Sequence, residues 1–259
     1  KMEDLNLAGR TALVTAATAG IGLATAVVLA RHGATVWLNG RSESHLTDAR
    51  EGVLATVPWA DLRTVVGDVS TAGGVDATTA AAPDVDILVN MAGGTDHQRP
   101  FVELTDADWQ QQWDLNVMSG VRLTRHYVPL LLNKTYGRIV FVSSAAGLVT
   151  DREMVDYGVV KAAVIRLSHA VAEIFTGHDV TVNCVVPGAT LSNWVVESAR
   201  GSTIDDFARR VFPSDSTSLL RRFATPEEVA SLIAYICSPD ATAIRGAVLR
   251  ADGGLVRTD

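Results

Sequence analysis

The strongest constraint on the fold is a series of short apolar runs rich in Val, Ile and Leu that recur along the chain. These runs are apolar at nearly every position rather than at every second one. Strands of that kind are buried on both faces, which is typical of a parallel sheet between layers of helices. The predicted strands are Thr11–Thr15, Thr35–Asn39, Arg63–Val66, Asp86–Asn90, Arg138–Ser143, Val180–Val185 and Ala247–Arg250.

Helical patterns separate most of these runs. They predict one helix that ends at Ala30, another that begins at Pro226, and three further helices over Ser42–Thr56, Asp106–Asn133 and Val155–Phe175. Strand–helix alternation without a linker predicts one doubly wound α/β (Rossmann) domain over residues 1–259, with about seven parallel strands and helices on both faces. One long segment, Gly188–Phe223, is predicted to be irregular and to form a lid or binding loop, or else to be disordered.

Composition narrows the class of protein. The chain has 259 residues, of which 47% are hydrophobic, and a formal net charge of −7. An acidic chain without a Lys/Arg block is not expected to bind nucleic acid. Its apolar runs are too short to span a membrane, and its first residues do not form a signal peptide. The cysteines, Cys184 and Cys237, lack metal-ligand spacing, so we expect a cytoplasmic protein with no metal site.

A glycine-containing turn follows the first predicted strand. Its sequence runs from Thr15 to Gly22 (TAATAGIG) and leads into an Ala-rich helix. Small residues let a pyrophosphate approach the backbone, and the helix N-terminus supplies N–H donors. The turn therefore predicts a dinucleotide site; the alternative is a tight turn without a ligand. The predicted contacts are Thr15, Ala17, Thr18, Gly20, Ile21 and Gly22.

The end of the second predicted strand bears on the type of cofactor. Asn39-Gly40-Arg41 lies about twenty residues past the glycine turn and contains no acid. A carboxylate there would bind a ribose 2′-hydroxyl, whereas Arg41 would pair with a 2′-phosphate. Asn39 and Arg41 therefore favour NADP(H), and NAD(H) stays possible because Glu43 is close. The alternative for Arg41 is a solvated surface residue.

Tyr157 and Lys161 are four residues apart and so share one face of a predicted helix. Lysine occurs only at positions 1, 134 and 161, which makes a chance pairing improbable. A free tyrosine titrates near pH ~10. A cation one turn away is expected to lower that pKa and suit the phenol to proton exchange with a carbonyl or an alcohol. The alternative is a surface cation lying against an aromatic ring.

Two polar residues are candidates to complete this site. Ser144 follows the Arg138–Ser143 strand, where it can hydrogen-bond a substrate oxygen; Ser143 is the competing assignment. Asn116 lies inside a predicted helix although asparagine is a poor helix former, so we expect a used amide or a local distortion there. A buried asparagine that satisfies the backbone is the alternative.

Taken together, these motifs resemble the short-chain dehydrogenase/reductase superfamily, in its compact single-domain branch (3-oxoacyl carrier-protein reductase-like). The resemblance covers nearly the whole chain and adds Asn90-Met91-Ala92-Gly93 and Pro187-Gly188. It implies an NAD(P)-dependent oxidoreductase of class EC 1.1.1 acting on a small carbonyl or alcohol. It also implies a homotetramer, or a dimer, assembled through the helices that hold Asn116 and Tyr157.

The resemblance also implies roles for single residues. Tyr157 would be the general acid or base, Lys161 would lower its pKa and bind the nicotinamide ribose, Ser144 would orient the substrate oxygen, and Asn116 would hold a relay water. Further cofactor contacts would come from Asp68, Val69, Asn90, Ala92, Gly93, Pro187, Gly188 and Ser192.

Three positions depart from the family pattern. Ala16 replaces a glycine of the turn and is expected to fit if its φ is negative. Met91 replaces a second asparagine, and Ser192 stands where a threonine is common.

Substrate selection is expected to come from Gly94–Arg99, Leu148–Met154 and Leu191–Phe223. Ser144, Met154, Tyr157 and Trp194 are the predicted substrate contacts, and Phe207 and Phe212 are further candidates for an apolar wall. An anionic substrate or carrier would be met by Arg99, Arg152, Arg209 or Arg210. The expected reaction is reduction of a 3-oxoacyl-like or small ketone. The alternatives are an NAD-dependent alcohol or sugar dehydrogenase and, less favoured, a non-catalytic dinucleotide sensor.

Overall fold

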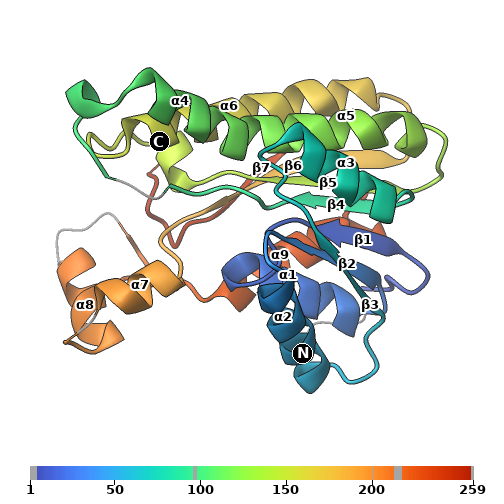
Figure 1. Cartoon of the computed structure of the whole chain (residues 1–259), viewed down its shortest axis with the longest axis horizontal. Coiled ribbons are helices and arrows are strands. Elements are labelled where there is room, and N and C mark those ends of the chain that lie inside the picture. The colour runs from blue at the N-terminus through green and yellow to red at the C-terminus, as the bar shows by residue number, and fades with distance from the viewer. Residues whose placement is uncertain (1–4, 96–97, 200, 213–217, 258–259) are drawn as a thin grey trace.

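The computed structural model describes residues 5–95, 98–199, 201–212 and 218–257, without the side chains of residues 193 and 194. Within this part of the chain, seven parallel strands form one sheet in the order β3-β2-β1-β4-β5-β6-β7 (Figure 1). This confirms the predicted doubly wound α/β class. The strands are β1 Thr11–Val14, β2 Thr35–Gly40, β3 Leu62–Val66, β4 Ile87–Asn90, β5 Gly137–Val142, β6 Val180–Pro187 and β7 Val248–Ala251.

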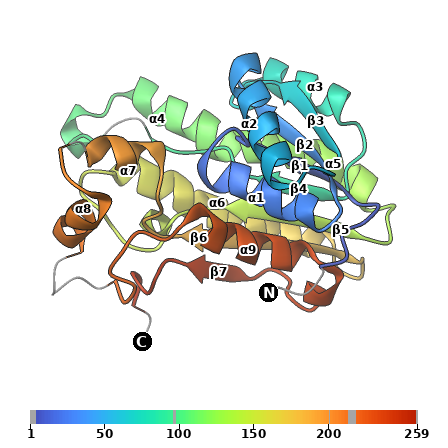
Figure 2. The same ribbon diagram turned by 90° about the horizontal axis from the view of Figure 1, so that it is seen from below.

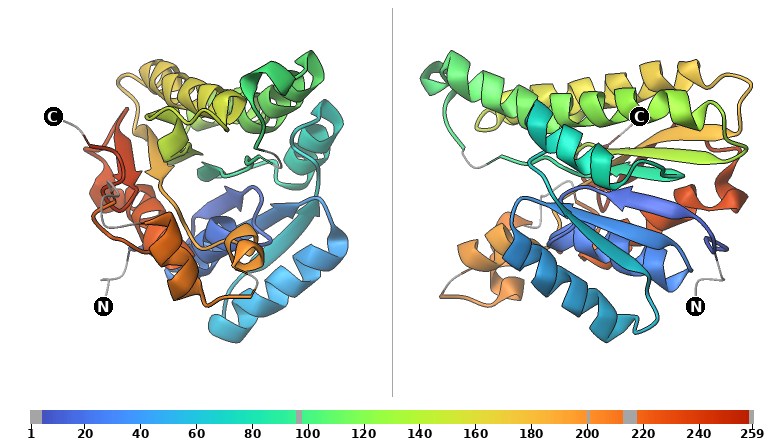
Figure 3. Two further views of the ribbon diagram at one scale, coloured as in Figure 1. Left: turned by 90° about the vertical axis from the view of Figure 1, so that its left-hand side faces the viewer. Right: turned by 45° about the vertical axis from the view of Figure 1, so that its right-hand side comes forward.

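Helices cover both faces of the sheet. They are α1 Gly20–Arg31, α2 Glu43–Thr56, α3 Ala72–Ala81, α4 Asp106–Trp113, α5 Ser119–Leu131, α6 Val155–Ile174, α7 Asn193–Ser198, α8 Ile204–Val211 and α9 Pro226–Cys237. Two views show the layers: α1, α2 and α9 lie on one face, and α3, α5 and α6 lie on the other (Figures 2 and 3). Each face has its own apolar core, because residues that alternate along a strand point to opposite faces.

The position of the site follows from the strand order. β1 lies between β2 and β4, so the chain leaves β1 toward one edge of the sheet and later returns to build the other. Such a switch point leaves a crevice at the carboxyl ends of the central strands. The glycine turn follows β1, the Asn90 turn follows β4 and Ser144 follows β5, so the three meet at this edge.

Three elements differ from the expectation. The helix α3 was not predicted, because Gly73 and Gly74 in its first turn are poor helix formers. The predicted helix over Asp106–Asn133 is α4, a π-helical turn over Asp114–Met118, and α5. The segment expected to be irregular contains α7 and α8, which begin at the side-chain caps Ser192 and Thr203.

Candidate functional site

Two cavities meet at the carboxyl ends of the strands. The first, of about 290 Å³, runs from the glycine turn to Tyr157 and Lys161. The second, of about 550 Å³, lies between Tyr157 and the α7–α8 segment. Tyr157, Thr190 and Ser192 line both cavities, so a molecule in one can touch a molecule in the other. Ten predicted residues line the first cavity: Gly20, Ile21, Gly22, Gly93, Ser144, Tyr157, Lys161, Pro187, Gly188 and Ser192.

The glycine turn is tightly folded. A Cβ on Gly22 would lie 2.3 Å from the Ala16 carbonyl oxygen, so only glycine fits there. Ala16 itself has a φ of 49°, in the left-handed region that favours glycine. The condition set for an alanine here, a negative φ, is therefore not met: the turn keeps the conformation suited to glycine although an alanine occupies it. The turn lines the first cavity along Ala19–Gly22, where α1 begins and its N–H groups could meet a phosphate.

Thr15 holds the glycine turn against the loop after β4. Its Oγ1 donates to the Val89 carbonyl at 3.3 Å and accepts from the Met91 and Ala92 backbone N–H groups, both at 2.9 Å. Thr15 is fully buried. Its side chain thus fixes two walls of the crevice relative to each other, and it does not line the cavity.

Close packing brings Ser144 to Tyr157. The 3₁₀ turn Ala145–Gly147 lies against α6, where a Cβ on Gly158 would be 2.9 Å from the Ala146 carbonyl oxygen. Glycine inside α6 costs helix stability but permits this approach. Ser144, whose hydroxyl accepts from the Ala146 N–H at 3.2 Å, thereby lies near the Tyr157 phenol and lowers its pKa.

Ser143, the competing assignment, has a different partner. Its hydroxyl donates to the Lys161 carbonyl oxygen at 2.7 Å, and its side chain is buried. That bond ties the end of β5 to α6. Of the two serines, Ser144 is the one that the geometry places beside the phenol.

Lys161 lies one turn beyond Tyr157 and is almost fully buried. Its Nζ donates to the Val142 carbonyl at 3.2 Å and lies 5.6 Å from the centre of the Tyr157 ring. A Cβ on Gly93 would lie only 2.6 Å from this Nζ. Burial lowers the pKa of Lys161 to about 8, because the ammonium loses its hydration.

The Tyr157 phenol has a raised pKa in the protein alone. Burial is the main cause, and the hydrogen bond from Ser144 offsets it in part. This differs from the expectation that Lys161 brings the pKa below the ordinary value: burial of the phenol is the larger cause, and the Lys161 Nζ lies over the ring, 5.6 Å from its centre.

Asn116 lies in the π-helical turn, so the expected local distortion is confirmed. Its Nδ2 donates to the Gly94 carbonyl at 3.0 Å and to the Gln112 side chain at 2.8 Å, while its Oδ1 accepts from the Gly94 N–H at 2.9 Å. The extra residue of a π turn rotates a side chain out of the helical register. Here it directs the amide to the loop after β4, so close to Gly93 that a Cβ there would lie 2.7 Å from the Asn116 Oδ1.

Several predicted cofactor residues lie near the first cavity without lining it. The Asn39 amide donates to the Gly67 carbonyl at 3.0 Å and to the Thr78 hydroxyl at 3.2 Å, which ties β2 to α3. The Asp68 carboxylate accepts from the Ser70 N–H and hydroxyl. Arg41 is exposed just past β2. Ala17, Thr18, Val69, Asn90 and Ala92 lie in the loops around the cavity or in the core behind it.

The second cavity is largely apolar. Met154 lines it, as predicted, together with Ala189, Val195, Val211 and Phe223. Phe207 and Phe212 do not: both pack on Phe223, with ring centres 5.8 and 5.2 Å from it. Trp194 is within α7, but its side chain lies outside the described residues.

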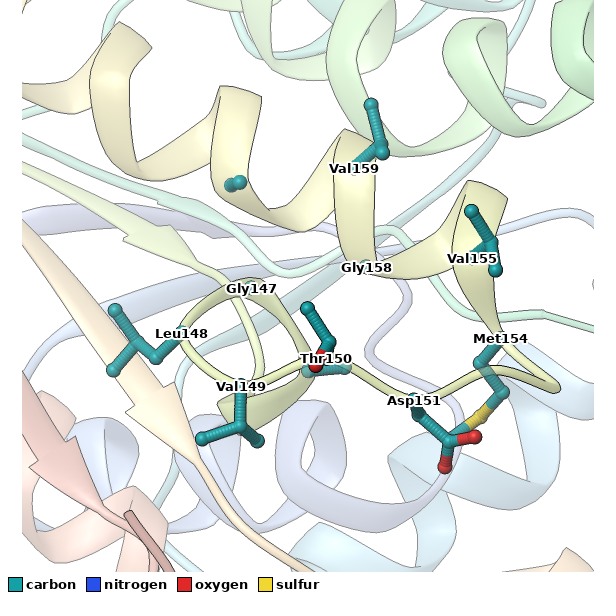
Figure 4. A pocket seen from close by; sticks show the side chains of 11 residues that line it. Gly147, Leu148, Val149, Thr150, Asp151, Met154, Val155, Gly158 and Val159 are labelled. Atoms are coloured by element: carbon teal, nitrogen blue, oxygen red, sulfur yellow. The ribbon is translucent and has the colours of Figure 1, made fainter. Parts of the chain in front are cut away.

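A third cavity, of about 240 Å³, opens on the other side of the α6 N-terminus (Figure 4). Leu148, Val149 and Val159 line it, and it shares Met154 with the second cavity. It contains none of Ser144, Tyr157 and Lys161, so we do not assign the reaction to it.

Comparison with known proteins identifies the family. A family model described as enoyl-(acyl carrier protein) reductase matches residues 15–256. A solved "short chain dehydrogenase/reductase family protein" is 33% identical, with 96% of this chain and 98% of that one covered and a TM-score of 0.84. The chain belongs to the short-chain dehydrogenase/reductase superfamily.

Other members of the superfamily are similar over nearly their whole length. The "uncharacterized oxidoreductase YvaG" of Bacillus subtilis is 38% identical, with 98% of each chain covered. The 3-oxoacyl-[acyl-carrier-protein] reductase of Vibrio cholerae is 31% identical, with 97% of this chain and 99% of that one covered. L-sorbose reductase from Gluconobacter frateurii, solved with NADPH and L-sorbose, is 31% identical, with 99% and 100% covered and a TM-score of 0.90.

Membership makes this chain an NAD(P)-dependent short-chain oxidoreductase of class EC 1.1.1, with a nicotinamide dinucleotide as cofactor. Among the described residues, no helix is long and apolar enough to cross a membrane, and no three His, Cys, Asp or Glu side chains converge as a metal site.

Sequence reasoning missed some of the residues that line the cavities. Thr190 lines both cavities, and it follows Pro187-Gly188, which were predicted. Phe223 was taken only as the end of the long segment. Its place in the cavity depends on contacts between Ala224 and the Ala189–Leu191 segment, which are distant in sequence.

Proposed function

We propose that this short-chain dehydrogenase/reductase is an NADP(H)-dependent ketone reductase in which Tyr157 transfers the proton. The observation that carries the proposal is the Tyr157 phenol, which lines both cavities beside Ser144 and lies one helical turn from buried Lys161. A proton donor at that junction can reach a carbonyl in the second cavity while the reductant lies in the first.

The first cavity suits a dinucleotide. Its glycine turn leaves no room for a Cβ at Gly22, and the lack of a Cβ at Gly93 lets Lys161 and Asn116 approach the backbone closely. The glycine turn would hold the pyrophosphate at the start of α1, and Lys161 would meet the nicotinamide ribose. Arg41, exposed at the end of β2, would pair with a 2′-phosphate, which supports NADP(H) over NAD(H).

The protein groups divide the work of reduction. When bound, the reduced nicotinamide supplies a hydride to the carbonyl carbon. Tyr157 Oη donates its proton to the carbonyl oxygen, which yields the secondary alcohol and leaves a phenolate. The Ser144 hydroxyl, whose oxygen accepts from Ala146 N–H, donates toward the same oxygen and orients it. The Lys161 ammonium stabilises the phenolate until a proton returns, and Asn116 would hold a water on that route.

The same proposal assigns the long segment to substrate access. The α7–α8 helices have a small apolar core of their own and face Met154 and Tyr157 across the second cavity. We assign residues 188–223 to a lid over the substrate. We assign the α4–α5 helical segment, which contains Asn116, and α6 to the interface of a homotetramer or a dimer.

The proposal is tested by replacing Tyr157 with phenylalanine. Loss of the proton donor should lower kcat for ketone reduction by about 10²–10⁴-fold and leave the Kd of NADPH within about two-fold. Ketone reduction is followed by nicotinamide absorbance and the Kd by NADPH fluorescence. Tyr235→Phe, at an exposed position on α9, is the matched control and should behave as wild type. Undiminished turnover in Tyr157→Phe would refute the mechanism, and equal Kd values for NADPH and NADH would refute the NADP preference.

A further inference from the structure

The second cavity is built to receive an apolar body. Its side chains that are remote from the reacting groups are mostly apolar: Met154 from the start of α6, and Val195, Val211 and Phe223 from the lid. These residues come from segments far apart in the sequence and converge beside the Tyr157 phenol. Its volume of about 550 Å³ is in the range of sites for small organic ligands, about 300–1,000 Å³.

Few polar groups are free to recognise a substrate in this cavity. Besides the residues shared with the first cavity, only Thr95 and Gln98 are polar among the described lining residues. Thr95 Oγ1 already accepts from Gln112 Nε2 at 3.1 Å, and Gln98 Nε2 lies 3.7 Å from Met154 Sδ. None of the described lining residues carries a charge. Against these described residues, a carboxylate or phosphate would give up its hydration without gaining an ion pair.

Three of the four arginines that could have met an anionic substrate have other partners, and none of the four lines the cavity. Arg99 pairs with Asp108 at 2.5 Å, and Arg209 pairs with Asp206. Arg210 donates to the Ser202 hydroxyl at 3.1 Å. Neither these three nor the exposed Arg152 lines the cavity. Their positions remove the main sequence-based reason to expect an anion.

We infer that the substrate is an uncharged ketone with an apolar body, and neither a keto acid nor a polyhydroxylated sugar. The inference rests on the proposed ketone reduction and adds the chemical class of the molecule reduced. An apolar body gains from burial against Met154, Val195 and Phe223. A ketohexose would bury hydroxyls for which, away from the reacting groups, the described lining residues offer only Thr95 and Gln98.

A matched pair of substrates isolates the effect of charge. Ethyl acetoacetate and acetoacetate present the same methyl ketone, but only the second carries a carboxylate at neutral pH. With NADPH, the ester is expected to show a kcat/KM at least ten-fold higher than acetoacetate, and also at least ten-fold higher than L-sorbose. An equal or lower kcat/KM for the ester in either comparison would overturn the inference.

A binding measurement separates this inference from the proposed reaction. In the presence of saturating NADP⁺, the ester should raise Tm by mass action, whereas acetoacetate at equal concentration should not. Turnover of both ketones at equal kcat/KM would overturn the inference and leave the proposed function intact. A Tm shift by the ester alone, without turnover of any ketone, would support the cavity's preference and overturn the reaction. No shift by the ester and no turnover would overturn both.

A charge placed at the cavity should weaken the preference for the ester. Gln98→Arg adds a cation at an exposed lining residue and is expected to raise the kcat/KM ratio of acetoacetate to ester by at least five-fold. Gln111→Arg, the same change at an exposed position on α4 outside the cavity, should leave the ratio unchanged. If both variants change it equally, the cavity does not select by charge.

Discussion

At the scale of single residues, Lys161 sets how the site responds to pH. Its pKa is lowered to about 8, so in the free enzyme it is an ammonium below that pH and neutral above it. Neutral Lys161 cannot stabilise the negative charge that Tyr157 acquires as its proton leaves. We therefore expect kcat/KM for ketone reduction to fall as pH rises through about 8. A pH–rate profile from pH 6 to 9.5 measures this, because kcat/KM reports ionisations of the free enzyme.

The assignment to Lys161 has a control in this chain. The Lys134 ammonium is paired with Asp84 and Asp86, which raise its pKa, so it cannot titrate near 8. The descending limb should persist unchanged in Lys134→Met. A kcat/KM that stays constant to pH 9.5 in the wild type would show that the charge of Lys161 is not needed.

Single residues show which features of the site could be predicted from the sequence and which could not. Tyr157 and Lys161 were foreseeable together, because a spacing of four residues fixes a shared helical face. The pKa values of Tyr157 and Lys161 could not be predicted, because the burial that shifts them comes from contacts with segments distant in sequence. The same holds for Asn39, whose amide bonds with Gly67 and Thr78 across two other elements.

At the scale of elements, the local sequence pattern predicted the strands well and missed the features that depend on tertiary packing. Runs of Val, Ile and Leu located all seven strands. Only Asn116 indicated the π-helical turn at Asp114–Met118 in the sequence. The turn depends on hydrogen bonds between the Asn116 amide and the Gly94 backbone, which is distant in sequence. The helix α8 carried a readable signal in Thr203 and Asp206, three residues apart as in a helix cap, although the surrounding segment shows no clear period.

The link between β5 and α9 depends on a buried arginine. Arg138 stacks on Tyr136 and donates to the Ser238 carbonyl and the Thr242 hydroxyl just past α9. Arg138→Met would leave these buried oxygens without their donor. We expect it to lower the free energy of unfolding by about 2–3 kcal/mol in urea denaturation. Arg63→Met, at an exposed position on β3, should cost less than about 1 kcal/mol. Equal losses would mean that the buried hydrogen bonds contribute nothing.

At the scale of the whole molecule, the C-terminal loop supports the segment that covers the second cavity. The Gly253 carbonyl accepts from the Leu219 and Leu220 N–H groups, both at 2.9 Å, four and three residues before Phe223. Asp252 shapes the loop by accepting from the Gly254 and Val256 N–H groups. The α7–α8 segment is therefore held at its far end by residues that follow β7, a pairing that no local pattern could reveal.

Gly253→Ala tests whether this support positions the substrate. Gly253 has a φ of 62°, and a Cβ there would lie 2.8 Å from Leu220 Cβ. The substitution should strain the loop by about 1–2 kcal/mol and displace the Leu219–Leu220 segment. We expect KM for the ketone to rise about three- to ten-fold with kcat little changed, because orientation at Tyr157 is kept while the cavity wall shifts.

Gly9→Ala is the matched control: its φ is 76°, with nothing within 4 Å of a Cβ. It should lower the free energy of unfolding by a similar amount and leave KM unchanged. A wild-type KM in Gly253→Ala would mean that the covering segment holds its place without the C-terminal loop.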